Sequence, residues 1–201
     1  MLNITEISEI IKKIDSLYSA YKNSYAKLKN EVFLCGTSVK YSSGGIVYPF
    51  GKYFFGRSKI FKKAAKQTSG HFCKDIDEAN FAYVFSESGQ LLAINQMFDY
   101  TKNSDGYVYY TSFLEYDTEK IHILKYRENS EVPVLCGIGI VYSRDNNEII
   151  VSSDAPCKFV TIVIIDNENN NEYLYYINRE LFATEYNLTS TEIYSDFSKL
   201  F

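Results

Sequence analysis

The sequence predicts an α+β protein built on an antiparallel β-meander, with residues 1–201 forming one domain. Polar turn residues recur roughly every eight to twelve residues through 79–178, as is typical of such a sheet. The 19 Tyr and 14 Phe favour half-buried strands. Apolar residues at helical spacing occupy 1–30 and 189–201. We therefore expect a curved sheet or a partly open barrel with a long N-terminal helix and a short C-terminal helix.

The N-terminal helix is expected over residues 1–30. Asn3 and Glu6 have the spacing of a capping box, in which each side chain accepts from the other residue's backbone N–H. Apolar residues then follow at alternating steps of three and four, on one helical face. They are Ile4, Ile7, Ile11, Ile14, Tyr18, Tyr21, Tyr25 and Leu28. We expect this stripe to lie across the sheet; a dimerising coiled-coil helix is the alternative.

Charge is segregated along the chain, whose pI is about 5.3. Residues 32–74, within a mixed segment over 31–78, hold eight Lys and Arg and no Asp or Glu, whereas 75–201 carry a net charge of −13. The basic segment is expected to pack on the acidic meander; a protein or anion site is an alternative. Nucleic-acid binding through its lysines and aromatic residues is disfavoured by the acidic chain. Within it we expect extended pieces at Ile46–Tyr48 and Lys52–Phe55 and a short helix over Arg57–Lys66.

The meander is expected to comprise eight strands. They are Phe81–Phe85, Leu91–Phe98, Tyr107–Tyr116, Ile121–Arg127, Val134–Ser143, Glu148–Ser152, Lys158–Ile165 and Glu172–Ile177. The strand Lys158–Ile165 is apolar on both faces, which predicts a central strand covered on both sides. A second capping box at Thr189–Glu192, followed by apolar residues at helical spacing, predicts the closing helix over 189–201.

No motif for catalysis, a cofactor or a metal is found. His71 and Cys73 would share a strand face, but nothing else marks a nucleophile, and His122 fits a half-exposed sheet residue. The four cysteines are far apart, as expected for reduced thiols rather than a zinc site or disulfides. No signal peptide or run of about 20 apolar residues is present, so we expect a cytoplasmic protein that is neither an enzyme nor membrane-bound.

Four stretches of the meander resemble small bacterial β-meander proteins, many of which are immunity proteins encoded beside polymorphic toxins. The stretches are Tyr83–Ile94, Tyr109–Tyr110, Phe113–Tyr116 and Lys120–Tyr126, within about 50 residues. The resemblance implies stoichiometric inhibition of one cognate toxin. It rests on hairpin pattern, so it carries over no functional residue.

The leading hypothesis is therefore a cytoplasmic protein-binding protein of the immunity type, without enzymatic activity, a cofactor or a metal. An acidic, tyrosine-rich surface would bind a basic toxin, since complementary charge speeds association and tyrosines supply binding energy. The candidate partner-binding residues are Asp99, Asp105, Tyr107, Tyr109, Glu115, Asp117 and Glu119. The alternative is a small-ligand-binding or enzymatic β-barrel with a tyrosine-lined cavity.

Overall fold

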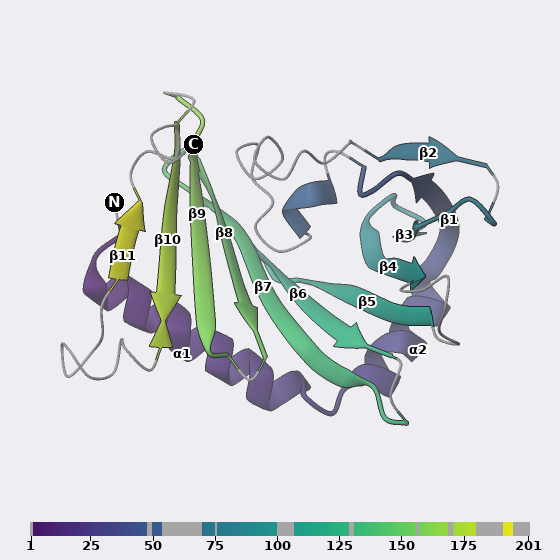
Figure 1. Ribbon diagram of the computed structural model, residues 1–201, viewed down its shortest axis with the longest axis horizontal. Coiled ribbons are helices and arrows are strands. Elements are labelled where there is room, and N and C mark those ends of the chain that lie inside the picture. The colour runs from purple at the N-terminus through teal and green to yellow at the C-terminus, as the bar shows by residue number, and fades with distance from the viewer. Residues whose placement is uncertain are drawn as a thin grey trace.

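Two helices followed by one antiparallel sheet make up the computed structural model (Figure 1). The structure describes residues 2–47, 50–53, 70–74, 76–99, 107–128, 131–155, 157–168, 171–179 and 191–194. Of residues 97–99, 107–109, 171–172 and 191–194 only the backbone is described. The two helices and the antiparallel sheet confirm the predicted α+β class. The predicted helix over Arg57–Lys66 lies outside the described residues.

Helix α1, Ile4–Tyr21, begins with the predicted capping box. Asn3 Oδ1 accepts from the Glu6 N–H at 3.0 Å, and Glu6 Oε2 accepts from the Asn3 N–H at 2.7 Å. The apolar stripe packs on the sheet, as predicted, with Ile14 completely buried.

A single helix over residues 1–30 is wrong, because the chain turns after Tyr21 and starts a second helix, α2, Tyr25–Cys35. At the turn, the Ser24 N–H bonds the Tyr21 carbonyl at 2.9 Å, and the Ser24 hydroxyl donates to the Ala20 carbonyl at 3.1 Å. The Tyr126 hydroxyl, from the sheet, also donates to the Tyr21 carbonyl. Carbonyls at a helix end have no partner within the helix, so these donors satisfy the end of α1. The change in direction lets the two helices follow the twisted sheet (Figure 1).

The sheet has eleven described strands in the order β11-β10-β9-β8-β7-β6-β5-β4-β3-β1-β2. They are β1 Gly36–Ser43, β2 His71–Cys73, β3 Phe81–Ser86, β4 Leu91–Asp99, β5 Tyr107–Tyr116, β6 Lys120–Arg127, β7 Val134–Arg144, β8 Asn147–Asp154, β9 Phe159–Asp166, β10 Asn171–Asn178 and β11 Thr191–Tyr194. Every neighbouring pair is antiparallel, and β3 to β10 confirm the predicted meander. The sheet does not close into a barrel, since β2 and β11 are its edges.

Two local predictions fail, and one strand was not predicted. Thr191–Tyr194 is strand β11, paired with β10, so this part of the expected C-terminal helix is wrong; 189–190 and 195–201 lie outside the described residues. Its Thr, Ile and Tyr residues suit a strand, and β10 offers an edge to pair with. The extended piece expected at Lys52–Phe55 is wrong for Lys52 and Tyr53, which belong to a 3-10 helix, η1, Phe50–Tyr53; residues 54–55 lie outside the described residues. Of the piece expected at Ile46–Tyr48, Ile46 and Val47 form no strand and Tyr48 lies outside the described residues. Strand β1 was not expected at all.

The two sheet faces have separate cores. The helix-covered face carries one apolar row in register across nine strands, broken once by a serine: Val39, Val84, Ala93, Phe113, Leu124, Ile138, Ser153, Val160 and Ile177. On the opposite face Phe50 and Tyr53 of η1 pack on buried residues of β3 to β5, including Tyr83. Strand β9 is buried on both faces, Ile162 on one and Val163 on the other, as predicted for a central strand.

Replacing Tyr126 by phenylalanine should destabilise the protein by about 1 kcal/mol, because it removes this donor from the part-buried Tyr21 carbonyl and leaves it only the Ser24 N–H. Chemical denaturation measures the free energy of unfolding. Tyr176→Phe is the matched control, since Tyr176 stacks on Phe159 at the exposed surface, and its effect should stay within about 0.5 kcal/mol. Equal effects of the two substitutions would contradict the role assigned to the Tyr126 hydroxyl.

Candidate functional site

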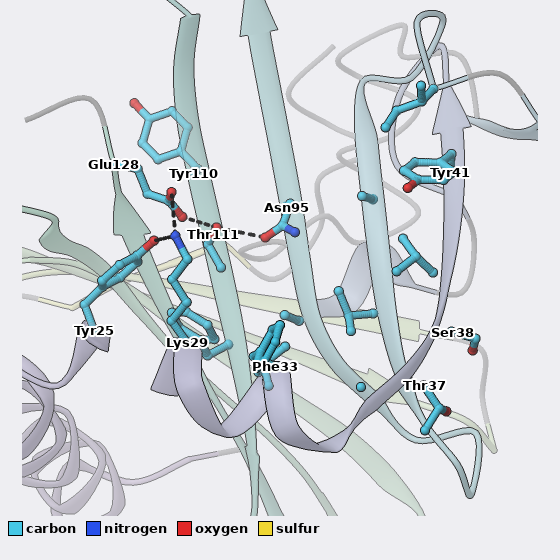
Figure 2. A pocket seen from close by; sticks show the side chains of 18 residues that line it. Tyr25, Lys29, Phe33, Thr37, Ser38, Tyr41, Asn95, Tyr110, Thr111 and Glu128 are labelled. Atoms are coloured by element: carbon cyan, nitrogen blue, oxygen red, sulfur yellow. Dashed lines mark hydrogen bonds and ion pairs between the residues drawn. The ribbon is translucent and has the colours of Figure 1, made fainter. Parts of the chain in front are cut away.

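The candidate site is an open pocket of about 690 Å³ between α2 and the sheet end formed by β1, β3, β4 and β5 (Figure 2). Its lining residues come from α2, these four strands, the β2–β3 connection and the end of β6. They are Tyr25, Lys29, Val32, Phe33, Gly36, Thr37, Ser38, Val39, Tyr41, Ile76, Ala82, Val84, Ala93, Asn95, Tyr110, Thr111, Phe113 and Glu128. The lining is mostly apolar, as is usual for ligand and partner pockets.

The pocket exists because small side chains form its floor where the helices provide little cover. Ala82 and Ala93 stand on the helix-covered face of β3 and β4, where larger residues occupy the same face of the more central strands. Helix α1 is tied to the other half of the sheet, by Arg144–Glu6 from β7 and Arg179–Asp15 beyond β10. On this face α2 is the described helix that reaches the β1–β5 end, and it leaves the space above the alanines open.

The pocket rim exposes apolar side chains. Phe33 on α2 is 80% exposed, Ile76 in the β2–β3 connection is 54% exposed and Val39 on β1 is 46% exposed. Single exposed apolar residues are ordinary, whereas three around one concavity make it a candidate interaction site. In Figure 2 Phe33 projects from α2 across the strands that form the floor.

A polar network closes the end of the pocket near β5 and β6. The Lys29 ammonium donates to the Tyr25 hydroxyl at 3.0 Å and lies 4.0 Å from the Glu128 carboxylate (Figure 2). Burial raises the pKa of Tyr25, with Lys29 lowering and Glu128 raising it further. The hydrogen bond to Tyr25 raises the pKa of Lys29, so the ammonium keeps its charge at neutral pH. Its side chain is 63% exposed, which leaves this cation accessible to a ligand.

The Thr111 hydroxyl joins two further groups to this network. It contacts Glu128 Oε1 and lies 2.8 Å from the Asn95 side chain. One hydroxyl proton cannot serve two acceptors. The carboxylate is the stronger acceptor, so Thr111 donates to Glu128, and rotating the Asn95 amide by 180° would place its Nδ2 instead of its Oδ1 toward the Thr111 oxygen. The network is thereby satisfied internally and holds Glu128 in place.

An aromatic cluster fixes the α2 wall. The Tyr25 ring packs edge-on against Phe113 and Tyr126, with ring centroids 5.8 Å and 5.4 Å away. Edge-to-face pairs at such distances contribute about 0.5–1.5 kcal/mol each beyond the apolar area that they bury. Because Tyr126 also holds the end of α1, one sheet residue positions both helices.

The predicted partner-binding residues fall at opposite ends of β5. Asp99 pairs with Tyr107 at one end, where only the backbone of Asp99, Tyr107 and Tyr109 is described; Asp105 lies outside the described residues. Glu115 lies at the other end of β5, and Asp117 and Glu119 lie in the following turn. Ten residues from Tyr107 to Asp117 span about 33 Å of strand. The six predicted residues that the structure describes therefore do not meet at one point.

The acidic residues of the second group differ in what holds them. Glu115 is half-buried and accepts a hydrogen bond from the Tyr21 hydroxyl at 2.8 Å; burial, and then this bond, raise the pKa of Tyr21 to about 12. Asp117 accepts from the Thr118 N–H at 2.7 Å, which lowers its pKa. Glu119 is exposed. Only Asp117 and Glu119 thus present accessible carboxylates in this group.

The remaining candidates form no second site in the described part of the chain. His71 Nε2 lies 3.0 Å from the Ser43 hydroxyl on the neighbouring strand. His122 is buried rather than half-exposed, which corrects the sequence interpretation. No cluster of three metal-binding side chains is found among the described residues, and no described helix is long and apolar enough to cross a membrane. Within the described part of the basic segment, Lys52 forms an ion pair with Glu148 of the meander at 2.7 Å.

Comparison with protein-family models, curated proteins and solved structures finds no match to this chain. The function therefore has to be inferred from the pocket and its surroundings.

Stability should fall as the pH drops below 6.5, the ordinary pKa of histidine, because of His122. Its Nε2 is buried without a hydrogen-bond partner among the described residues. Burial first, and then the charge of Lys13 on α1, lower the pKa of His122 in the folded protein; Asp117 opposes them, and Lys120 adds a smaller lowering effect. The unfolded chain then binds the proton more readily, so acid favours unfolding from pH 6.5 down to the lowered pKa.

Denaturation of His122→Leu between pH 7.5 and about pH 5 tests this prediction. The variant should lose less stability than the wild type over that range, whatever its stability at neutral pH. The control His71→Gln keeps His122 and should follow the wild type. Parallel curves for the wild type and His122→Leu would contradict the assignment.

Proposed function

We propose that this protein is a non-enzymatic binding protein that receives apolar side chains of a protein partner in the pocket between α2 and the β1–β5 end of the sheet. The observation that carries the proposal is the combination of an open apolar concavity with exposed Phe33, Val39 and Ile76 on its rim. Burying such side chains against a partner stabilises a complex, and an aromatic residue at the rim is a typical centre of binding energy.

The chemistry of the lining supports binding rather than catalysis. Its charged groups are Lys29 and Glu128, which already pair with each other, and it contains neither histidine. A polar pair at one end of an apolar pocket orients a bound group and forms part of the polar rim expected of a protein interface.

A cognate bacterial toxin is the particular partner that we propose. The support is the sequence resemblance to immunity proteins together with the net charge of −13 over residues 75–201, which would attract a basic toxin. Among the partner-binding residues predicted from the sequence, Asp117 and Glu119 are the described acidic residues that remain exposed for that attraction. In this proposal they speed encounter, while the pocket supplies affinity.

A small amphiphilic ligand is the second candidate. The pocket volume of about 690 Å³ lies within the range of roughly 300–1,000 Å³ that small-molecule sites occupy. The accessible Lys29 ammonium could pair with an anionic headgroup. A ligand that co-purifies with the protein and is lost on changing Lys29 to glutamine would favour this candidate over a protein partner.

Two substitutions on adjacent residues of α2 test the role of the pocket. Phe33 lines it, whereas the similarly exposed Leu34 does not. Both become alanine, a good helix former, so neither change should disturb α2. Affinity for a partner captured from native-host lysate and then purified should fall about tenfold or more in Phe33→Ala, and less than about twofold in Leu34→Ala. Calorimetry measures both; equal affinities would contradict the pocket proposal.

Co-expression tests the identity of the partner. If the neighbouring gene encodes a toxin, the wild-type protein should restore growth to cells that express it, and purification should recover an equimolar complex. Phe33→Ala should protect less well than Leu34→Ala at equal protein levels. Lack of protection by the wild type would remove the toxin proposal and leave the pocket proposal to the affinity test.

A further inference from the structure

Strand β1 has an open edge beside the pocket. On its inner side β1 pairs with β3 along its length, but on its outer side β2 pairs only with Tyr41, Ser42 and Ser43. No described strand pairs with the outer side of Gly36–Lys40. Thr37, Ser38, Val39 and Lys40 are all exposed. Because N–H and C=O groups alternate between the two edges of a strand, part of this backbone faces outward and can bind another extended chain.

This edge and the pocket share the same residues. Gly36, Thr37, Ser38 and Val39 line the pocket, and Thr37 and Ser38 lie on the outer side of β1 in Figure 2. Val39 begins the register row that continues through Val84 and Ala93 on the helix-covered face. A strand added outside β1 would extend this row by one residue. The side chain beside Val39 would therefore lie at the pocket mouth.

The opposite face of the same edge is basic. Lys40 is exposed and lies over the rings of Phe85 and Phe72, with its Nζ 5.3 Å and 5.8 Å from their centroids. No Asp or Glu occurs anywhere in residues 32–74, so the segment that contains β1 offers no acidic side chain of its own. Oppositely charged residues on neighbouring strands stabilise their pairing. A partner strand is therefore favoured when it carries an acidic residue beside Lys40.

We propose that the partner of this protein binds as an added β-strand along Gly36–Lys40, with an apolar side chain beside Val39 entering the pocket and an adjacent acidic side chain beside Lys40. The inference rests on the proposed function and specifies which part of the basic partner binds this edge: an extended segment of alternating apolar and acidic residues. Main-chain hydrogen bonds would hold the segment, and the two side chains would select it.

The β-bulge in β1 limits non-specific pairing of other chains with this edge. The register with β3 shifts between Gly36 and Ser38, which leaves Thr37 as the extra residue. Bulges and exposed lysines are common means by which proteins prevent indiscriminate pairing of an edge strand. A second copy of this chain would bring two Lys40 side chains to one edge, whereas an acidic segment removes that repulsion.

The test uses the full-length protein and a phage-displayed library of random octapeptides. Selected peptides should share neighbouring apolar and acidic residues. NMR amide exchange of the complex with one such synthetic peptide should slow at outward-facing amides of Gly36–Lys40, by about tenfold or more. Selection of peptides without that pattern, or protection elsewhere, such as at β11, overturns the proposal.

Matched substitutions separate main-chain from side-chain binding. A β-bulge can accommodate proline, but proline has no N–H to donate to an added strand. Thr37→Pro should therefore weaken peptide binding about tenfold. Thr37→Ala loses the same hydroxyl, which donates to the Phe85 carbonyl at 3.5 Å, and should bind within about twofold of the wild type. Equal affinities of the two variants overturn the proposal.

A second pair of variants applies if Thr37→Pro does not fold. Val39→Asp places a like charge beside an acidic peptide and should weaken binding about tenfold, whereas Val134→Asp, at a valine of equal exposure on β7, should not. A dimer in light scattering that Val39→Asp converts to a monomer would overturn the proposal. If Phe33→Ala lowers the affinity for the purified partner but Val39→Asp and Thr37→Pro do not, the strand-addition proposal fails and the pocket function stands. If Phe33→Ala has no effect, the proposed function fails.

Discussion

The hydrogen bond from Tyr126 to the Tyr21 carbonyl is the contact on which the arrangement of the two helices depends. It supplies a buried donor at the end of α1, where backbone carbonyls have no helical partner. The same tyrosine packs edge-on against Tyr25 at the start of α2. One residue of β6 thus ends one helix and positions the next. Without that turn, α2 would not stand over β3 to β5, and the pocket would lack its outer wall.

Charge is used differently at the two ends of β5. Glu115 looks in the sequence like part of an acidic binding surface, yet it holds the Tyr21 hydroxyl and so supports the helix turn. Lys52 of η1 similarly forms an ion pair with Glu148 of β8. By contrast, Asp117, Glu119 and Lys40 remain exposed. The segregated charge of the chain is therefore partly internal, and the described residues still expose carboxylates at the β5–β6 turn and an ammonium at the β1 edge.

The sequence predicted what local rules control. Turn spacing placed the meander, the Asn3–Glu6 pair placed the start of α1, and the two apolar faces of β9 identified a covered strand. The helix break was not predictable, because the stripe continues through it and its cause is a tyrosine 105 residues away. Strand β1 is polar and basic, so its pairing with β3 gave no alternating pattern. The pocket depends on alanines of two strands meeting beneath α2, which no single segment reveals.

The pocket lies where the sheet extends beyond α1, and this position accounts for its small apolar lining residues. Under α1 the sheet is filled by isoleucine, leucine and valine, and any further space there would cost stability. At the β1–β5 end the alanines leave space that water can enter from the open side, so the cost of the unfilled volume is smaller. An edge strand borders the same space. A protein that only needed to be stable would fill this end with larger residues and cover the edge. The open pocket and the open β1 edge lie side by side, so one extended partner segment could complete the strand row and the apolar core together.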